Sequence, residues 1–197
     1  YLDNPRMWWP AQMGKPELYT LKLTFEADGK TSDSASTKFG IREITSELND
    51  NGKRVFSING KKVLIRGGGW TPDMMLRQSP QRLRDEFNYV QDMGLNTVRL
   101  EGKLETEDFF RLADERGVLV MAGWCCCDHW EHWDKWAKGD LEIANASLYS
   151  QISRLRAHPS VFVWLNGSDG PPPANVESTY IATLKERDWP NPFISSA

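Results

Sequence analysis

Apolar and polar side chains alternate strictly near the beginning of the chain. From Tyr19 to Phe25, every second residue is apolar. A period of two is typical of a β-strand with one apolar face. Asp28-Gly29 is a turn signal, and a second strand is expected near residues 34–44. Because two or three strands cannot bury a core alone, we expect this segment to pair with strands outside the given sequence.

The pattern changes after Asn59-Gly60, a hairpin signal between two short apolar runs. Beyond this turn, apolar runs of strand length alternate with stretches of helical periodicity. Strands are expected over Val63–Arg66, Thr97–Leu100, Val118–Ala122, Val161–Leu165 and from Phe193 onward. Helices are expected to begin at Ser79-Pro80, at Thr106, near Leu141 and after Pro173. This alternation predicts a parallel sheet with right-handed crossovers.

Four strand–helix units and a fifth strand make up half of an eightfold barrel, and a doubly wound sheet is the alternative. The positions of the acidic residues favour the barrel, whose active sites lie at the carboxyl ends of the strands. An acid follows each of the first four strands: Asp73, Glu101, then Asp128 with Glu131, and Asp169. The sequence therefore predicts an acidic rim at one end of the sheet.

Two of these acids stand out. Glu101 directly follows a strand that contains Arg99, and a buried guanidinium needs a partner. We expect an arginine–carboxylate pair that holds the mouth of the barrel together or also shapes a substrate pocket. Asp169 follows a buried strand and lies between Gly167 and Gly170, which allow a close backbone turn. It is a candidate general acid, although an aspartate that only caps a turn has the same local pattern.

Composition narrows the choice of partner. A net charge of −3 gives no reason to expect nucleic acid or an anionic membrane, and no apolar run is long enough to span a bilayer. Five of the nine tryptophans lie within residues 124–164, where they either pack in the core or line a cleft. The three cysteines are consecutive, Cys125 to Cys127, which matches neither a zinc site nor a disulfide framework.

Several motifs resemble glycoside hydrolase family 2. Asn4–Pro10 and Gly14–Leu21 resemble the end of that family's immunoglobulin-like domain, Phe39–Glu43 its junction, and Asn59–Gly67 its first barrel strand. The resemblance implies a multidomain β plus α/β fold. Residues 1–45 would be the C-terminal part of an immunoglobulin-like β-sandwich. Residues 46–197 would be the first, N-terminal half of a (β/α)8 TIM barrel.

The resemblance also implies an active site. The family's acid/base normally lies in an Asn-Glu pair after the fourth strand, where this chain has Ser168-Asp169. That variant is similar to the exo-β-D-glucosaminidase subgroup, which acts on chitosan and chitooligosaccharides by a retaining mechanism. Asp169 would then be the acid/base. The nucleophile would be a glutamate after a seventh strand, beyond residue 197, so the chain alone is expected to be inactive.

The residues expected to bind substrate are Asp73, Glu101, Cys125, Asp128, Trp130, Asn166 and Ser168. Asp73 is expected to pair with the ammonium group of glucosamine. Cys125 departs from the pattern, because similar enzymes have a glutamate there. The departure keeps open a β-mannosidase or β-galactosidase type of hydrolase. A non-catalytic carbohydrate-binding fragment is a third interpretation.

The resemblance implies no cofactor, and no set of ligands indicates a metal. The expected partners are a carbohydrate substrate and the remainder of the same polypeptide. Polysaccharide degradation and the glycosylation sequon Asn145-Ala146-Ser147 favour an extracellular location.

Overall fold

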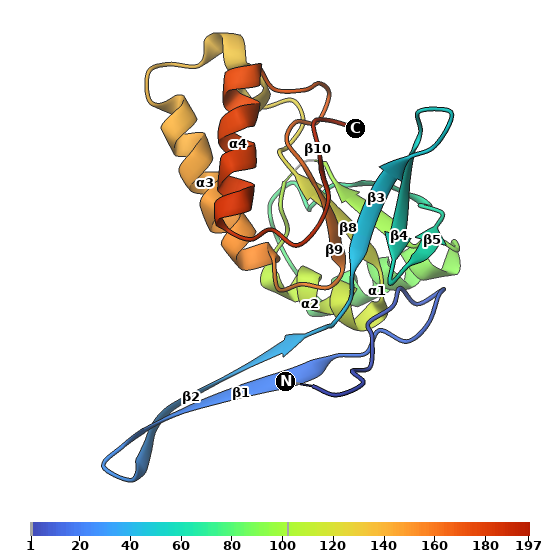
Figure 1. The fold of residues 1–197 in the computed structure, drawn as a ribbon, viewed down its shortest axis with the longest axis vertical. Helices are drawn as coiled ribbons and strands as arrows, with labels where there is room; N and C mark the ends of the chain where they lie inside the picture. The colour runs from blue at the N-terminus through green and yellow to red at the C-terminus, as the bar shows by residue number, and fades with distance from the viewer. Residues whose placement is uncertain (1, 102) are drawn as a thin grey trace.

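A five-stranded parallel sheet forms the middle of the molecule in the computed structural model, which describes residues 2–101 and 103–197 (Figure 1). Its strands are β6 (Gly67–Trp70), β7 (Thr97–Leu100), β8 (Leu119–Gly123), β9 (Val161–Leu165) and β10 (Phe193–Ile194). Strands that follow one another in sequence are neighbours throughout, in the order β10-β9-β8-β7-β6. The sheet therefore grows in one direction, and the predicted strand–helix alternation is confirmed.

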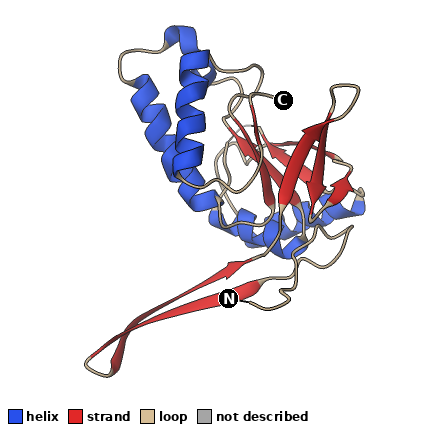
Figure 2. Cartoon of the chain, in the orientation of Figure 1, coloured by secondary structure: helices blue, strands red, loops and turns tan. Residues whose placement is uncertain are grey.

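Helices connect these strands (Figure 2). They are α1 (Pro80–Asp92), α2 (Glu107–Arg116), α3 (Asp140–Leu155) and α4 (Ala174–Glu186). The hydroxyl of Ser79 accepts a hydrogen bond from the backbone N–H of Arg82, and Pro80 occupies the first turn, as the sequence predicted. Gly117 ends α2 with a φ of 65°. In the described part of the chain, no helix combines the length and the apolar character needed to cross a bilayer.

One apolar core unites all four helices with one face of the sheet. Phe87 of α1, Phe109 of α2, Leu148 of α3 and Tyr180 of α4 are each fully buried in the same cluster as Val120 of β8. Burial of one such side chain contributes about 1.5–3 kcal/mol. The helices thus cover the same face of the sheet, whereas a doubly wound sheet carries helices on both faces.

A small antiparallel sheet covers the opposite face. It consists of β3 (Ile44–Leu48), β4 (Arg54–Ile58) and β5 (Lys61–Val63). Phe56 packs edge-on against Phe162 of β9, with 5.0 Å between the ring centroids, inside a second buried cluster. Asn59 and Gly60 both have positive φ and join β4 to β5, so the predicted hairpin is confirmed.

A long hairpin extends away from this body (Figure 1). It pairs β1 (Tyr19–Ala27) with β2 (Lys30–Phe39) across the turn at Asp28-Gly29. The apolar row predicted for the first strand is present and lies exposed at Leu21, Leu23 and Phe25.

The strand expected near residues 34–44 ends earlier than the sequence predicted. β2 stops at Phe39, and Ile44 already belongs to β3 in another sheet. Arg42 lies between the two strands, and its guanidinium donates to the carbonyls of Pro159 and Val161. These bonds draw the connection toward β9, which interrupts the strand.

The first parallel strand also differs from the prediction. The sequence predicted Val63–Arg66 followed by glycines, but the glycines themselves form β6, and Val63 is the last residue of β5. A Cβ on Gly67 would overlap the carbonyl of Thr97 on β7, whereas nothing lies within 4 Å of the Cβ position of Gly68. The first glycine is therefore required by the close approach of two strands.

A pair of glycine variants tests this requirement. We expect Gly67→Ala to lower the free energy of unfolding by about 1–3 kcal/mol, because the added methyl group forces the strands apart. Gly68→Ala, one residue away in the same strand, is expected to change it by less than about 0.5 kcal/mol. Urea denaturation followed by circular dichroism measures both. Equal losses in the two variants would contradict the explanation.

Candidate active site

Asp169 lies in the loop directly after β9, at the carboxyl end of the strand. Its side chain is exposed, whereas the neighbouring Ser168 is buried. A Cβ on Gly167 would overlap the carbonyl of Gly170, so the turn that presents Asp169 needs glycine at this position. Gly170 has open space around its Cβ position, so only one of the two expected glycines is required by close contact.

Glu131 fixes the backbone of this turn. Its Oε1 accepts hydrogen bonds from the N–H groups of Ser168, at 2.5 Å, and Asp169, at 3.0 Å. Its Oε2 accepts one from the N–H of Cys127, at 3.1 Å. A single carboxylate thus ties the loop after β8 to the loop after β9, through bonds that are stronger than neutral ones because the acceptor is charged.

Arg99 reaches the same turn from β7. Its Nη2 donates to the hydroxyl of Ser168 at 2.6 Å. The expected arginine–carboxylate pair is therefore replaced by a hydroxyl contact, and among residues 2–101 and 103–197 no ion pair joins Arg99 to Glu101. The carboxylate of Glu101 instead lies against Gly69, and its backbone carbonyl accepts from the N–H of Cys126 at 2.9 Å.

The cysteine run lies beside Asp169. A disulfide joins the adjacent Cys126 and Cys127, a pairing that the sequence did not predict. The sulfur of Cys126 lies 3.7 Å from each carboxylate oxygen of Asp169, and that of Cys127 lies 4.0 Å from one of them. Cys127 has a φ of 63°, a left-handed conformation that is uncommon outside glycine.

Cys125 is half-buried and remains a free thiol. Burial, followed by the negative charge of Asp128, raises the pKa of this thiol above its usual value. At neutral pH the thiol is therefore uncharged, so it supplies no negative charge to a bound amine.

The loops enclose an open hollow of about 390 Å³. It is lined by Cys127, Glu131, His132, Trp133, Asp169 and Gly170. Its size is within the usual range for small-molecule sites. Sequence reasoning had placed Glu131 on the acidic rim but missed its contacts, and it had not selected His132 or Trp133. Only the spacing of acids after the strands could have pointed to Glu131.

Asp128 and Trp130 shape the loop from within. The carboxylate of Asp128 accepts from the N–H of Trp130 at 2.9 Å and caps a short 3-10 turn, η1 (His129–Glu131). A second such turn, η2 (Trp133–Lys135), follows. Trp130 packs between Trp124 and Trp136, with ring centroids 6.0 and 5.9 Å away. Packing therefore accounts for much of the tryptophan cluster, and Trp133 is the member that lines the hollow.

Asn166 lies at the end of β9 and is fully buried. Its Nδ2 donates to the carboxylate of Glu177 on α4 at 3.3 Å. Its Oδ1 is buried and has no hydrogen-bond partner in the described part of the chain.

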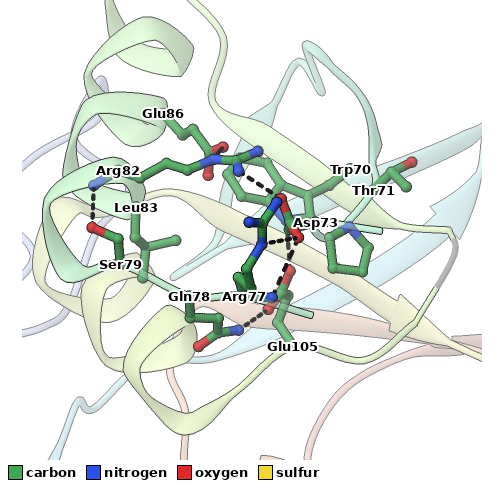
Figure 3. A pocket seen from close by; sticks show the side chains of 11 residues that line it. Trp70, Thr71, Asp73, Arg77, Gln78, Ser79, Arg82, Leu83, Glu86 and Glu105 are labelled. Atoms are coloured by element: carbon green, nitrogen blue, oxygen red, sulfur yellow. Dashed lines mark hydrogen bonds and ion pairs between the residues drawn. The ribbon is translucent and has the colours of Figure 1, made fainter. Parts of the chain in front are cut away.

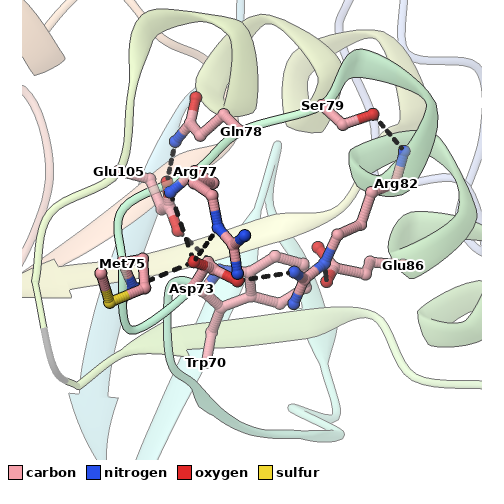
Figure 4. A network of polar contacts seen from close by, with 9 residues as sticks. All are labelled: Trp70, Asp73, Met75, Arg77, Gln78, Ser79, Arg82, Glu86 and Glu105. Atoms are coloured by element: carbon pink, nitrogen blue, oxygen red, sulfur yellow. Dashed lines mark hydrogen bonds and ion pairs between the residues drawn. The ribbon is translucent and has the colours of Figure 1, made fainter.

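Asp73 lies in a separate pocket with Trp70 and Glu105 (Figure 3). The residues lining this pocket include none of those that line the hollow beside Asp169. Arg82 binds one oxygen of Asp73 at 2.8 Å, and Arg77 approaches the other at 3.6 Å (Figure 4). The backbone N–H of Met75, then the bond from Arg82, lower the pKa of Asp73 below its usual value. Asp73 is therefore ionised and already paired with cationic side chains.

Comparison with known proteins gives relatives over the whole chain. Residues 1–42 match the model of the family described as "Glycosyl hydrolases family 2". An exo-β-D-glucosaminidase of Streptomyces avermitilis is 44% identical over 100% of this chain and 23% of its own length. A mannosylglycoprotein endo-β-mannosidase of Lilium longiflorum is 33% identical over 94% of the chain and 20% of its own length.

The solved structure of an exo-chitosanase from Amycolatopsis orientalis, in complex with PNP-β-D-glucosamine, has the same fold. The TM-score is 0.93 at 45% identity, over 100% of this chain and 24% of that one. The chain thus spans about a quarter or less of the proteins that it matches. The resemblance to glycoside hydrolase family 2 that the sequence indicated is confirmed.

Hydrogen exchange tests the role of Glu131. We expect Glu131→Gln to lower the protection of the Ser168 and Asp169 amides by about tenfold or more, because hydrogen bonds to a charged acceptor contribute roughly 1.5–3 kcal/mol. Asp134→Asn, at an exposed acid in the same loop, is the control and should leave both amides unchanged. Unaltered protection in the Glu131 variant would show that the turn holds its shape without this carboxylate.

Proposed function

We propose that this chain forms part of a retaining family 2 glycoside hydrolase that removes terminal β-linked glucosamine from chitosan or chitooligosaccharides. The main support is the position of Asp169, whose exposed carboxyl group borders a sugar-sized hollow while its backbone is held by Glu131. The 44% identity to an exo-β-D-glucosaminidase supports the choice of substrate.

In the proposed reaction, Asp169 acts twice. As a carboxylic acid it protonates the glycosidic oxygen of the leaving group, and as a carboxylate it then removes a proton from the attacking water. A retaining site needs a second carboxylate about 5–5.5 Å away as nucleophile. Glu131 is unsuited to that task, since three backbone N–H groups occupy its oxygens. We assign the nucleophile to a glutamate after a seventh strand, as the family resemblance implies.

We further propose that the parallel sheet is half of a (β/α)8 barrel and that the N-terminal hairpin belongs to an immunoglobulin-like sandwich. The sequential strand order and the four helices on one face support the first proposal. The exposed apolar row of β1 supports the second, since further strands would bury it. The corresponding domains are residues 1–45 and 46–197, and the remaining polypeptide would complete both.

Specificity for glucosamine depends on which residues bind its ammonium group. Asp73 must exchange an arginine partner for the ammonium group if it binds glucosamine, since Arg77 and Arg82 both contact it. Cys125 is neutral at a position where the family resemblance implies a glutamate. These two observations favour the second candidate, a β-mannosidase or β-galactosidase type of activity. For either substrate, we propose an extracellular site of action because the polysaccharides are degraded there.

Substrate preference separates the two candidates. A polypeptide that carries this chain at the length of its relatives should hydrolyse chitosan oligomers with a higher kcat/KM than aryl β-mannosides or aryl β-galactosides. The comparison requires steady-state rates on all three substrates. Faster turnover of a neutral glycoside would rule out the glucosaminidase and leave the family-level proposal in place.

Asp169→Asn in the same polypeptide tests the catalytic role. We expect kcat/KM to fall by roughly 10²–10⁴-fold, because the amide can neither donate nor accept the proton. Asp134→Asn removes an acid outside the hollow, and its kcat/KM should stay within about twofold of the wild-type value. If the Asp169 variant kept activity within about tenfold of the wild type, the acid/base assignment would be wrong.

A further inference from the structure

We propose that Cys126, Cys127 and Asp169 form a binding site for a thiophilic divalent cation, such as Zn²⁺ or Cd²⁺, when the two cysteines are reduced. The three side chains bring two sulfur atoms and a carboxylate oxygen to within 4.8 Å of one another. Cys127 and Asp169 line the hollow, where a cation can enter from solvent, and the sulfur of Cys126 lies 3.7 Å from the carboxylate of Asp169. This proposal concerns binding alone and does not rest on the proposed hydrolase activity.

The sulfur–oxygen separations suit a tetrahedral centre. With Zn–S near 2.3 Å and Zn–O near 2.1 Å, a sulfur and an oxygen on the same ion lie about 3.6 Å apart. The sulfur of Cys126 lies 3.7 Å from both oxygens of Asp169, and that of Cys127 lies 4.0 Å from one. Each sulfur thus already lies near this distance from Asp169, and once the disulfide is reduced the two sulfurs must move apart from each other before both can bind the same ion.

The backbone already holds the ligands in place. Neighbouring residues in extended chain point in opposite directions, but the φ of 63° at Cys127 turns both sulfurs toward Asp169. Glu131 then holds the backbone N–H of Cys127 and that of Asp169 on one carboxylate. A site whose ligands are fixed before the ion arrives loses less entropy on binding.

The ligand types favour a soft cation. Thiolates select Zn²⁺ and Cd²⁺ over Mg²⁺ or Ca²⁺, which take oxygen ligands. Two thiolates and one carboxylate carry three negative charges, which exceed the charge of the ion by one. Water from the hollow can take a fourth position, because Cys127 and Asp169 both line this open space.

The disulfide makes the site dependent on reduction. A tertiary phosphine attacks one sulfur, the S–S bond breaks, and the displaced thiolate takes a proton from water. Hydrolysis of the phosphorus–sulfur adduct releases the second thiol and the phosphine oxide, so the sulfurs gain the two electrons that phosphorus loses. The cation then displaces one proton from each thiol into solvent.

Cadmium titration of the full chain tests the proposal. After phosphine reduction and exchange into oxygen-free buffer, we expect the ultraviolet cadmium–thiolate absorption band to saturate at one Cd²⁺ per chain. Competition with a chromophoric chelator gives the corresponding affinity for Zn²⁺. The unreduced chain should show no band. Absence of the band from the reduced chain, with its circular dichroism unchanged, would overturn the proposal.

Four variants locate the ligands. Cys126→Ser/Cys127→Ser should abolish the band, whereas Cys125→Ser should retain it, since that thiol lies outside the cluster. Asp169→Asn should weaken binding by about tenfold or more, and Asp134→Asn should leave it unchanged.

If the double variant does not fold, the single cysteine variants replace it, and each should weaken binding by at least about tenfold. A band that survives loss of Cys126 and Cys127 would show that cadmium binds elsewhere. Equal affinities of the Asp169 variant and the wild type would exclude the three-ligand site.

Discussion

Three backbone N–H groups from two separate loops converge on the carboxylate of Glu131, and the geometry around Asp169 depends on this convergence. Removing this carboxylate takes a charged acceptor away from N–H groups in both loops, so it destabilises both loops at once. The side chain of Arg99 adds a second anchor through the hydroxyl of Ser168. Asp169 is thus exposed on a turn that is itself held firmly, which is the combination that a proton-transferring group needs.

The parallel sheet makes that convergence possible. Because all five strands run the same way, the loops after β8 and β9 leave the sheet at the same edge. Neighbouring strands approach closely where a glycine leaves room for the other backbone, as at Gly67 beside Thr97. Helices pack on one face and the small antiparallel sheet on the other, so the rim is the part of the sheet left free for chemistry.

The acids that follow the strands have different tasks despite their similar positions. Asp73 is neutralised by two arginines, and Asp128 caps a short turn. Glu131 holds backbone N–H groups, while the carboxylate of Asp169 contacts sulfur atoms and solvent. Asp169 is therefore a residue of both the proposed hydrolase site and the proposed cation site. A cation bound at Asp169 would occupy the group proposed to transfer the proton.

The sequence by itself determined the local structure. The hairpin at Asn59-Gly60, the helix start at Ser79-Pro80 and the strand Val161–Leu165 follow from turn chemistry, capping and apolar runs, all of which act within a few residues. The same reasoning placed Asp169 just after a buried strand. Only the tertiary structure decided which acceptor meets which donor. Glu131 binds Ser168, and Arg99 bonds the same residue, across separations of 37 and 69 positions that no local pattern encodes. Such pairings depend on strand register and on the packing of distant segments. The glycines of β6 likewise form a strand because they pair with the distant β7.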